Sequence, residues 1–178
     1  MAVFERSFDG TRGNQFPFIL QRIPPVGGPG PMLKLRAYFK GPITHESSPS
    51  WDARQDIGRA DPKYMYQTFS RNISFSFDLV AEGGSFDANY IKDTLNELDT
   101  MTVPLYKEGK GFQGNYVKFT IGKLYVGQYG IITAFNVTFD NSQITWDLDA
   151  KLPYFANVSM TIAWIGKRRP DIGTKTFG

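Results

Sequence analysis

The stretch from Arg71 to Leu79, Arg-Asn-Ile-Ser-Phe-Ser-Phe-Asp-Leu, decides the fold of this chain. Its apolar and polar side chains alternate one by one. Because successive side chains of a strand point to opposite faces, this alternation predicts a β-strand with one buried face and one polar face. The same pattern returns in residues 131–139 and 154–164. The chain is therefore predicted to be mainly β.

Length and composition favour a structural protein over an enzyme. The 178 residues suit one domain, which we expect to span 1–178. With no cysteine and one histidine, the chain has no thiolate chemistry, and we expect no cofactor and no metal site. The net charge of +3 is spread along the sequence, which is weak evidence for nucleic-acid binding. We find no secretory signal and no membrane-spanning run, so we expect no membrane partner.

One helix interrupts the strand patterns. Apolar residues recur at steps of three and four between Phe86 and Met101, which predicts an amphipathic helix at about 85–101. The expected strands are 16–23, 32–39, 63–80 with a bend or bulge near Gln67, 116–122, 124–126, 131–139 and 154–165, with a turn at Gly127–Gly130.

Three segments lack any periodicity, and we expect them to contact neighbouring subunits. They are an N-terminal arm at 1–15, a long loop at 41–62 and a C-terminal tail at 167–178. Structureless loops as long as 41–62 are uncommon in compact domains unless they are functional or disordered.

No group of residues matches a catalytic motif. His45 lies in the predicted long loop, and we interpret it as a solvated loop histidine, because a triad needs a buried acid that orients the imidazole. Asp140, Asp147 and Asp149 do not match the spacing of a calcium loop. We therefore predict that the chain is not an enzyme.

The order of motifs resembles a known family. Tyr66-x-x-x-x-Arg71-x-x-Ser74-x-Ser76-Phe77 leads into a helix ending in Leu-x-x-Leu, followed by Val-Pro-Leu-Tyr and Tyr-Val-Lys-Phe-Thr-Ile-Gly. Gly-Ile-Ile-Thr-Ala-Phe-Asn-Val-Thr-Phe-Asp, Trp-Asp and Leu-Pro-Tyr-Phe-Ala-Asn-Val-Ser-Met-Thr-Ile complete the series. Over residues 58–166 this resembles the tail-tube fold of contractile-tailed bacteriophages, most closely the tube-initiator and tube-cap proteins of the baseplate.

The resemblance implies an antiparallel β-sandwich or barrel of the tail-tube type with one flanking helix. It implies a hexameric ring in the phage tail or baseplate that nucleates or extends the tail tube. The partners would be copies of the chain, the tail tube protein and other baseplate proteins, with DNA or the tape measure passing without sequence-specific binding. Such a protein belongs to the virion and is assembled in the host cytoplasm. Lumens of these tubes tend to be acidic, whereas this chain is net basic.

Two sets of residues follow as candidate contacts. Those expected between subunits or stacked rings are Arg54, Asp56, Arg59, Asp61, Lys167, Arg168 and Arg169. Those expected on the lumen or sheet face are Ser74, Ser76, Asn136, Thr138, Ser159 and Thr161. The alternatives are a carbohydrate-binding β-sandwich using Trp51, Trp146 and Tyr154, an oligonucleotide-binding barrel, and a tail completion protein at the head-proximal end.

Overall fold

The fold was analysed in a computed structural model of the chain. It describes residues 18–24, 28–30, 32–35, 37–81, 85–107, 111–139, 146 and 151–165, with the backbone alone at 85–88 and 107. The predicted arm at 1–15 and tail at 167–178 lie outside these residues.

The described residues form ten strands and one helix. The strands are β1 (Phe18–Ile23), β2 (Met32–Leu35), β3 (Ala37–Phe39), β4 (Thr44–Arg54), β5 (Lys63–Val80), β6 (Leu105–Lys107), β7 (Gly111–Gln113), β8 (Tyr116–Ile121), β9 (Tyr125–Thr138) and β10 (Phe155–Ile165), and the helix is α1 (Ser85–Thr102). Eight strands make one antiparallel sheet in the order β2-β1-β8-β9-β10-β5-β3, with β4 paired to β5. β6 and β7 form a separate short hairpin.

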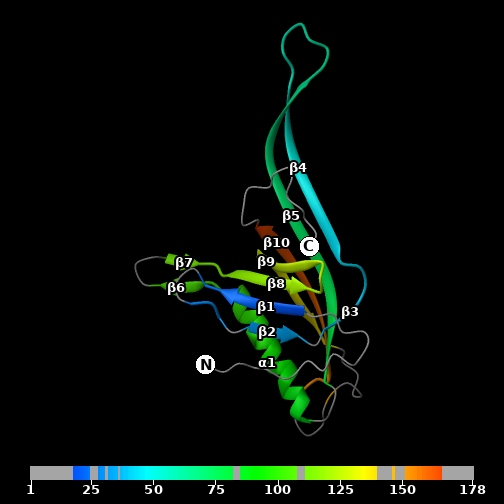
Figure 1. The fold of residues 1–178 in the computed structure, drawn as a ribbon, viewed down its shortest axis with the longest axis vertical. Helices are drawn as coiled ribbons and strands as arrows, with labels where there is room; N and C mark the ends of the chain where they lie inside the picture. The colour runs from blue at the N-terminus through cyan, green and yellow to red at the C-terminus, as the bar shows by residue number, and fades with distance from the viewer. Residues whose placement is uncertain are drawn as a thin grey trace.

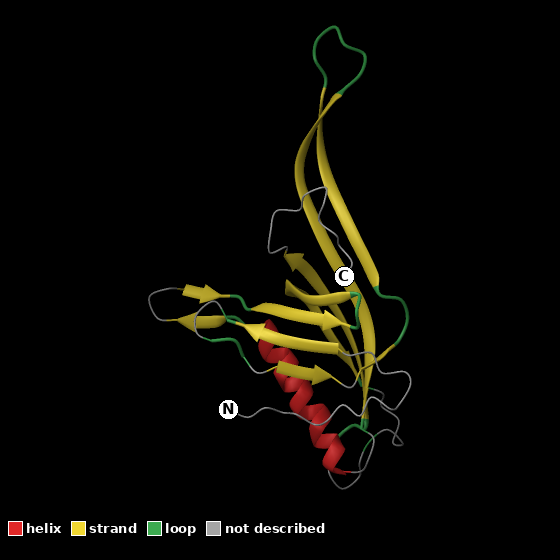
Figure 2. Cartoon of the chain, in the orientation of Figure 1, coloured by secondary structure: helices red, strands yellow, loops and turns green. Residues whose placement is uncertain are grey.

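The large sheet folds over into two layers because β9 belongs to both. Residues Tyr125–Gly130 pair with β8, and residues Tyr129–Thr138 pair with β10. Gly130 lies at this crossing. A Cβ there would lie 2.4 Å from the Ile162 side chain and 2.8 Å from the Ala163 carbonyl oxygen, so only glycine fits. Figure 2 shows the strands of the two layers crossing.

The two ends of the sheet come from one short stretch of chain. β2 pairs with β1 at one end, and β3 pairs with β5 at the other, with one residue between the two strands. Leu35 and Ala37 are both buried. No ladder joins β2 to β3 in the described part of the chain, so the sheet is a sandwich and not a closed barrel.

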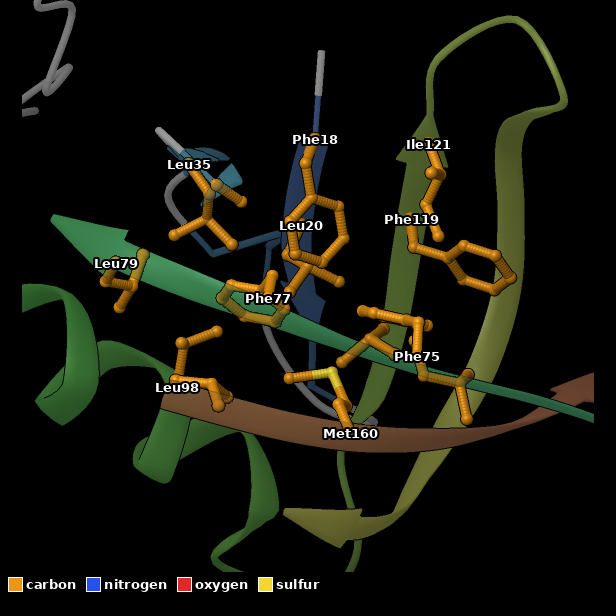
Figure 3. Packing of buried hydrophobic residues seen from close by; sticks show 14 of the residues in the cluster. Phe18, Leu20, Leu35, Phe75, Phe77, Leu79, Leu98, Phe119, Ile121 and Met160 are labelled. Carbon is orange, nitrogen blue, oxygen red and sulfur yellow. The ribbon is translucent and has the colours of Figure 1, made fainter. Parts of the chain in front are cut away.

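The core lies between the layers. The Phe18 ring of β1 contacts three rings of the opposite layer edge-on, with centroid distances of 5.4 Å to Phe75, 5.2 Å to Phe77 and 5.5 Å to Phe39. Figure 3 shows Phe18, Phe75 and Phe77 in the core together with Leu79 and Met160. The predicted mainly β sandwich is confirmed, and the four apolar positions of the opening stretch are all buried in its core.

The predicted helix is also confirmed. Its apolar stripe buries Ile91, Thr94, Leu98 and Met101, and α1 packs against β2 and β9. Its carboxyl end is capped by Asn115. The Nδ2 of Asn115 donates to the carbonyl oxygens of Thr100 at 3.3 Å and Val103 at 2.8 Å. Unpaired carbonyls at a helix end need such donors.

Three expectations were wrong. Thr44–Arg54, predicted as part of a structureless loop at 41–62, is strand β4. It lacks periodicity because most of its residues on both faces are exposed, and its order comes from pairing with β5. Residues 124–126 and 131–139 are not separate strands, because Gly127 and Gly130 lie within β9 and the turn falls at Gly122–Leu124. The predicted strand 32–39 is divided into β2 and β3.

Candidate assembly surface

The most exposed ordered feature is a long hairpin that projects from the sandwich. It consists of β4, the tip at 55–62 and residues Lys63–Ser70 of β5; we call it the long hairpin. Figure 1 shows it extending well beyond the two layers. All residues of β5 from Lys63 to Ser70 are exposed, whereas the second half of the same strand is alternately buried. A two-stranded hairpin without a covering layer is marginally stable in water.

One face of the long hairpin is aromatic. Pairing aligns Pro49 with Phe69, but Trp51 with Tyr66, so the ladder shifts by one residue at the predicted bulge near Gln67. The shift brings Tyr64 and Tyr66 to the face that carries Phe69 and Trp51. Trp51 and Tyr66 meet edge-to-face at 4.9 Å. We call Trp51, Tyr64, Tyr66 and Phe69 the aromatic stripe.

The aromatic stripe continues the core face of β5 into solvent. Within the body that face is covered by the opposite layer, whereas on the hairpin the exposed fractions are 55% for Trp51, 65% for Tyr64, 53% for Tyr66 and 38% for Phe69. Ile57 at the tip is fully exposed. Contiguous exposed apolar surface of this kind is typical of an interaction surface.

Four side chains join the root of the long hairpin to the body. We call His45, Arg71, Tyr125 and Trp164 the root cluster. The His45 ring stacks on Tyr125 at 6.1 Å and meets Trp164 edge-on at 5.8 Å, and the Arg71 guanidinium lies 3.9 Å from the centre of a Trp164 ring. His45 Nδ1 is 3.1 Å from the Tyr125 hydroxyl, and His45 Nε2 is 3.1 Å from Ser47 Oγ.

This packing corrects the interpretation of His45 as a solvated loop residue, because it lies in β4 and is half-buried. Burial, followed by the nearby Arg71 charge, lowers the pKa of His45 below 6.5. Burial also lowers the pKa of Arg71 and raises the pKa of Tyr125. The contact between His45 and Tyr125 spans 80 residues of sequence, so local patterns give no signal for it.

The polar face of the sandwich brings together the second set of predicted residues. Ser76 pairs with Ser159, which pairs with Asn136 on the next strand. Ser74 Oγ lies 3.1 Å from Thr161 Oγ1, while Thr138 is aligned with Asn157. All six predicted residues therefore share one face of β5, β10 and β9.

The only charge within this three-strand patch is a shielded one. Asp78 accepts a hydrogen bond from Asn157 Nδ2 at 2.6 Å, and its other oxygen is 4.0 Å from Lys40 Nζ. Between Ser74 and Asp78, the other residues aligned on this face carry hydroxyl, amide or methyl side chains. At the two ends of the patch, Val80 is aligned with Phe155, and Ala163 with Ile131. Such a surface can form hydrogen bonds but does not produce a strong electrostatic field.

Several strand edges stay open in the part of the chain that the structure describes. The ladder between β8 and β9 ends at Gly130, which leaves one edge of β9 unpaired from Ile131 to Thr138. The ladder between β10 and β5 begins at Asn72, so β5 has one unpaired edge from Lys63 to Arg71. Open edges of this length are templates for pairing with another chain.

Four of the seven predicted charged contacts, Arg54, Asp56, Arg59 and Asp61, lie at or next to the tip of the long hairpin. Arg54 pairs with Asp52 at 3.3 Å, and Asp56 pairs with Lys63. Arg59 and Asp61 have no ion pair within the described residues. Lys167, Arg168 and Arg169 lie outside those residues, as do Asp140, Asp147 and Asp149.

A second exposed aromatic pair went unpredicted. Tyr106 of β6 and Phe112 of β7 have centroids 6.2 Å apart and exposed fractions of 80% and 75%. Figure 1 shows this short hairpin on a different side of the body from the long hairpin. β6 and β7 have three residues each, too few for an alternation of apolar and polar residues to be seen in the sequence.

The candidate aromatic platform for carbohydrate is not assembled. Trp51 packs on Tyr66 of the long hairpin, whereas Trp146 forms a bridge with Pro153 and contacts Phe139 at 6.4 Å. Among the described residues, no three histidine, cysteine or carboxylate side chains are grouped so that they could hold a metal. Among the described residues, no helix is both long and apolar enough to cross a membrane.

No protein-family model matches the chain, and no curated protein sequence matches it. Among solved structures, a chain from "Cryo-EM structure of the anti-feeding prophage (AFP) baseplate, 6-fold symmetrised" is similar at 9% sequence identity and a TM-score of 0.34. The match covers 89% of this chain and 95% of that chain. The surfaces described above, and not this likeness, carry the functional conclusion.

Proposed function

We propose that this chain is a structural subunit of a phage-type tail or baseplate, where copies join into a hexameric ring that nucleates or extends the tail tube. It performs no reaction in this role. Its partners are copies of itself, the tail tube protein and other baseplate proteins, and it is part of the virion after assembly in the host cytoplasm.

The observation that carries the proposal is the uncovered aromatic stripe on the long hairpin. It continues the core face of β5 past the end of the opposite layer, so its own chain supplies no cover within the described residues. Burying a large apolar side chain fully contributes about 1.5–3 kcal/mol, and each ring of the aromatic stripe is already partly buried. A neighbouring subunit that covers the stripe therefore supplies the missing layer.

Open edges and distinct surfaces favour a ring over a two-fold dimer. A ring joins two different surfaces of the same chain head to tail, whereas a two-fold dimer repeats one surface. The chain offers the aromatic stripe and the open edge of β5 on its long hairpin, and the open edge of β9 elsewhere in the same sheet. Pairing between these edges extends the sheet from one subunit to the next.

In this arrangement the polar face lines the channel. Its Ser, Thr and Asn side chains, together with one shielded carboxylate, suit a wall past which DNA or the tape measure moves without being held. The charged tip of the long hairpin, with Arg54, Asp56, Arg59 and Asp61, contacts the adjacent ring. The order of motifs over residues 58–166, which resembles the tail-tube fold, supports the same arrangement.

Oligomeric state tests the ring. We expect the purified chain, of 20.1 kDa, to form a species of about 120 kDa in light scattering and six-fold rings in negative-stain micrographs. Replacing the cross-strand pair of the aromatic stripe by Trp51→Ser and Tyr66→Ser should abolish the ring and leave the thermal unfolding of the body unchanged. The matched control replaces the adjacent pair Ser50 and Thr68, which face the other way, by alanine, and it should still assemble.

The ring fails as a proposal if the natural chain stays monomeric at every concentration, alone and with tail tube protein. It also fails if the variant that lacks Trp51 and Tyr66 assembles as the natural chain does. Nucleation is tested separately by adding the chain to purified tail tube protein and following tube length and growth rate. An unchanged length and rate would contradict the nucleating role.

A further inference from the structure

The root cluster joins the long hairpin to the body through side chains of four strands. His45 comes from β4, Arg71 from β5, Tyr125 from β9 and Trp164 from β10. Beyond the root, the long hairpin has no covering layer in the described part of the chain. The direction in which the hairpin projects therefore depends on how the root cluster packs.

His45 is the titratable centre of this cluster. Its ring contacts the Tyr125 and Trp164 rings, which also meet each other edge-on at 6.3 Å, and it forms hydrogen bonds with two hydroxyl groups. From β5 the charged group that faces it is the Arg71 guanidinium, and from β9 the titratable group is the Tyr125 phenol. β10 contributes the uncharged Trp164, whose Nε1 is buried without a hydrogen-bond partner among the described residues.

On its own strand the neighbouring titratable residue is Glu46. The alternation of β4 directs Glu46 to the opposite face, where its Oε1 accepts a hydrogen bond from Ser48 at 3.1 Å. Arg71, held over Trp164 and 5.3 Å from the Phe69 ring centre, has no carboxylate partner among the described residues. A proton on His45 therefore places a second positive charge beside an uncompensated one.

We propose that the charge state of His45 controls how firmly the root of the long hairpin is seated on the body. Neutral His45 stacks on Tyr125 and Trp164 and keeps the hairpin in one direction. Protonated His45 is repelled by Arg71 and loses its favourable burial, so the root loosens and the hairpin samples several directions.

The direction of the effect follows from the pKa of His45. Burial and the Arg71 charge lower this pKa below 6.5 in the seated form, and release returns it toward 6.5. The seated form therefore binds fewer protons than the released form. The root of the long hairpin therefore stays packed on the body above pH 6.5, and this packing weakens as the pH falls below 6.5. His45 is the only histidine, the side chain whose ordinary pKa places its change of charge in this range.

The absence of cysteine allows spin labels to be placed cleanly. One label at Ile57→Cys reports the tip, and one at Asn96→Cys, on the exposed side of α1, reports the body. Double electron–electron resonance on full-length chain, diluted with unlabelled chain, measures the distance within one molecule whether or not rings form. We expect one narrow distance distribution at pH 8 and a broader or displaced one at pH 5, with a midpoint below 6.5.

His45→Gln supplies a neutral side chain that can still hydrogen-bond, and it should give the same distribution at both pH values. Arg71→Met removes the opposing charge and should reduce the change between the two pH values. The proposal is overturned if the natural chain gives one distribution at pH 8 and pH 5, or if His45→Gln changes as the natural chain does. Either result stands apart from the test of the ring, which measures mass and not hairpin direction.

Discussion

Gly130→Ala tests the crossing of β9 between the two layers. A Cβ at Gly130 would lie 2.4 Å from Ile162 Cγ2, 2.8 Å from the Ala163 carbonyl oxygen and 3.4 Å from Phe119 Cε1. Two of these distances are shorter than real Cβ contacts allow. Ile162 and Phe119 are fully buried, and the Ala163 residue that carries the carbonyl oxygen is part of the ladder with β9. None of these groups can move aside without disturbing the core.

The expected change in the free energy of unfolding has the opposite sign to the usual effect of replacing glycine by alanine. Alanine in place of glycine within a strand ordinarily stabilises a protein by about 0.4–1 kcal/mol, because it restricts the unfolded chain. Overpacking a full core costs about 1–3 kcal/mol. We therefore expect Gly130→Ala to lower the free energy of unfolding by about 1–3 kcal/mol, and the melting temperature by about 2–12 °C for a chain of this size.

The assay is thermal and urea unfolding followed by circular dichroism, at a concentration where the chain has one oligomeric state. Gly114→Ala is the matched control, because a Cβ at Gly114 meets nothing within 4 Å and should change the free energy of unfolding by less than about 0.5 kcal/mol. Ile162→Ala should reduce the cost of Gly130→Ala by removing one of the clashing groups. If Gly130→Ala is as stable as the natural chain or more so, the tight crossing described here does not exist.

Three further predictions of stability can be checked by the same unfolding measurements. Phe18→Ala should cost about 3–5 kcal/mol, because its ring fills the space between the layers and nothing nearby can replace it. Asn115→Asp should cost about 2–3 kcal/mol, since it removes the donor to the carbonyl oxygens of Thr100, in the last turn of α1, and Val103, just after α1. Asn96→Asp, at an exposed position of α1, should change the free energy of unfolding by less than about 0.5 kcal/mol. Equal effects of the two substitutions would contradict the capping role. The natural chain should lose stability as the pH falls from 7 to 5, and His45→Gln should lose less; parallel curves would show that His45 does not contribute.

Sequence reasoning succeeded where one strand has one buried face. Ile73, Phe75, Phe77 and Leu79 alternate with polar residues because the opposite layer covers only their side, so the periodicity records the burial directly. The helix was predictable for the same reason, since Ile91, Thr94, Leu98 and Met101 repeat at its period. The polar face was predictable too, because its residues are those that alternate with the buried ones.

Sequence reasoning failed where a strand is held by hydrogen bonds to its neighbouring strand and not by burial of one face. Thr44–Arg54 has no apolar period because most residues on both faces of β4 are exposed, and Pro49 with several serines suggests a loop. Its strand exists because β5 offers an unpaired edge beside it. Gly127 and Gly130 suggested a turn, whereas one supports a positive φ angle inside β9 and the other permits close packing.

The aromatic stripe was hidden for a related reason. Tyr64 and Tyr66 share a face with Trp51 only because the ladder shifts at the bulge. The pattern of residues predicts the bulge but not the change in pairing beyond it. The root cluster depends on contacts between residues far apart in the chain, such as His45 and Tyr125. Propensity and period carry no information on which distant side chain a ring will meet.

The short stretch that supplies both end strands, Met32–Phe39, has a consequence for hydrogen exchange. End strands of a sheet usually fray singly and expose their amides at low free-energy cost. Here β2 and β3 are neighbours in the chain, so detaching one pulls on the other across the core, at Leu35 and Ala37. Amides of both strands should therefore exchange together, at nearly the rate of global unfolding, and the two margins of this sandwich behave as one cooperative unit.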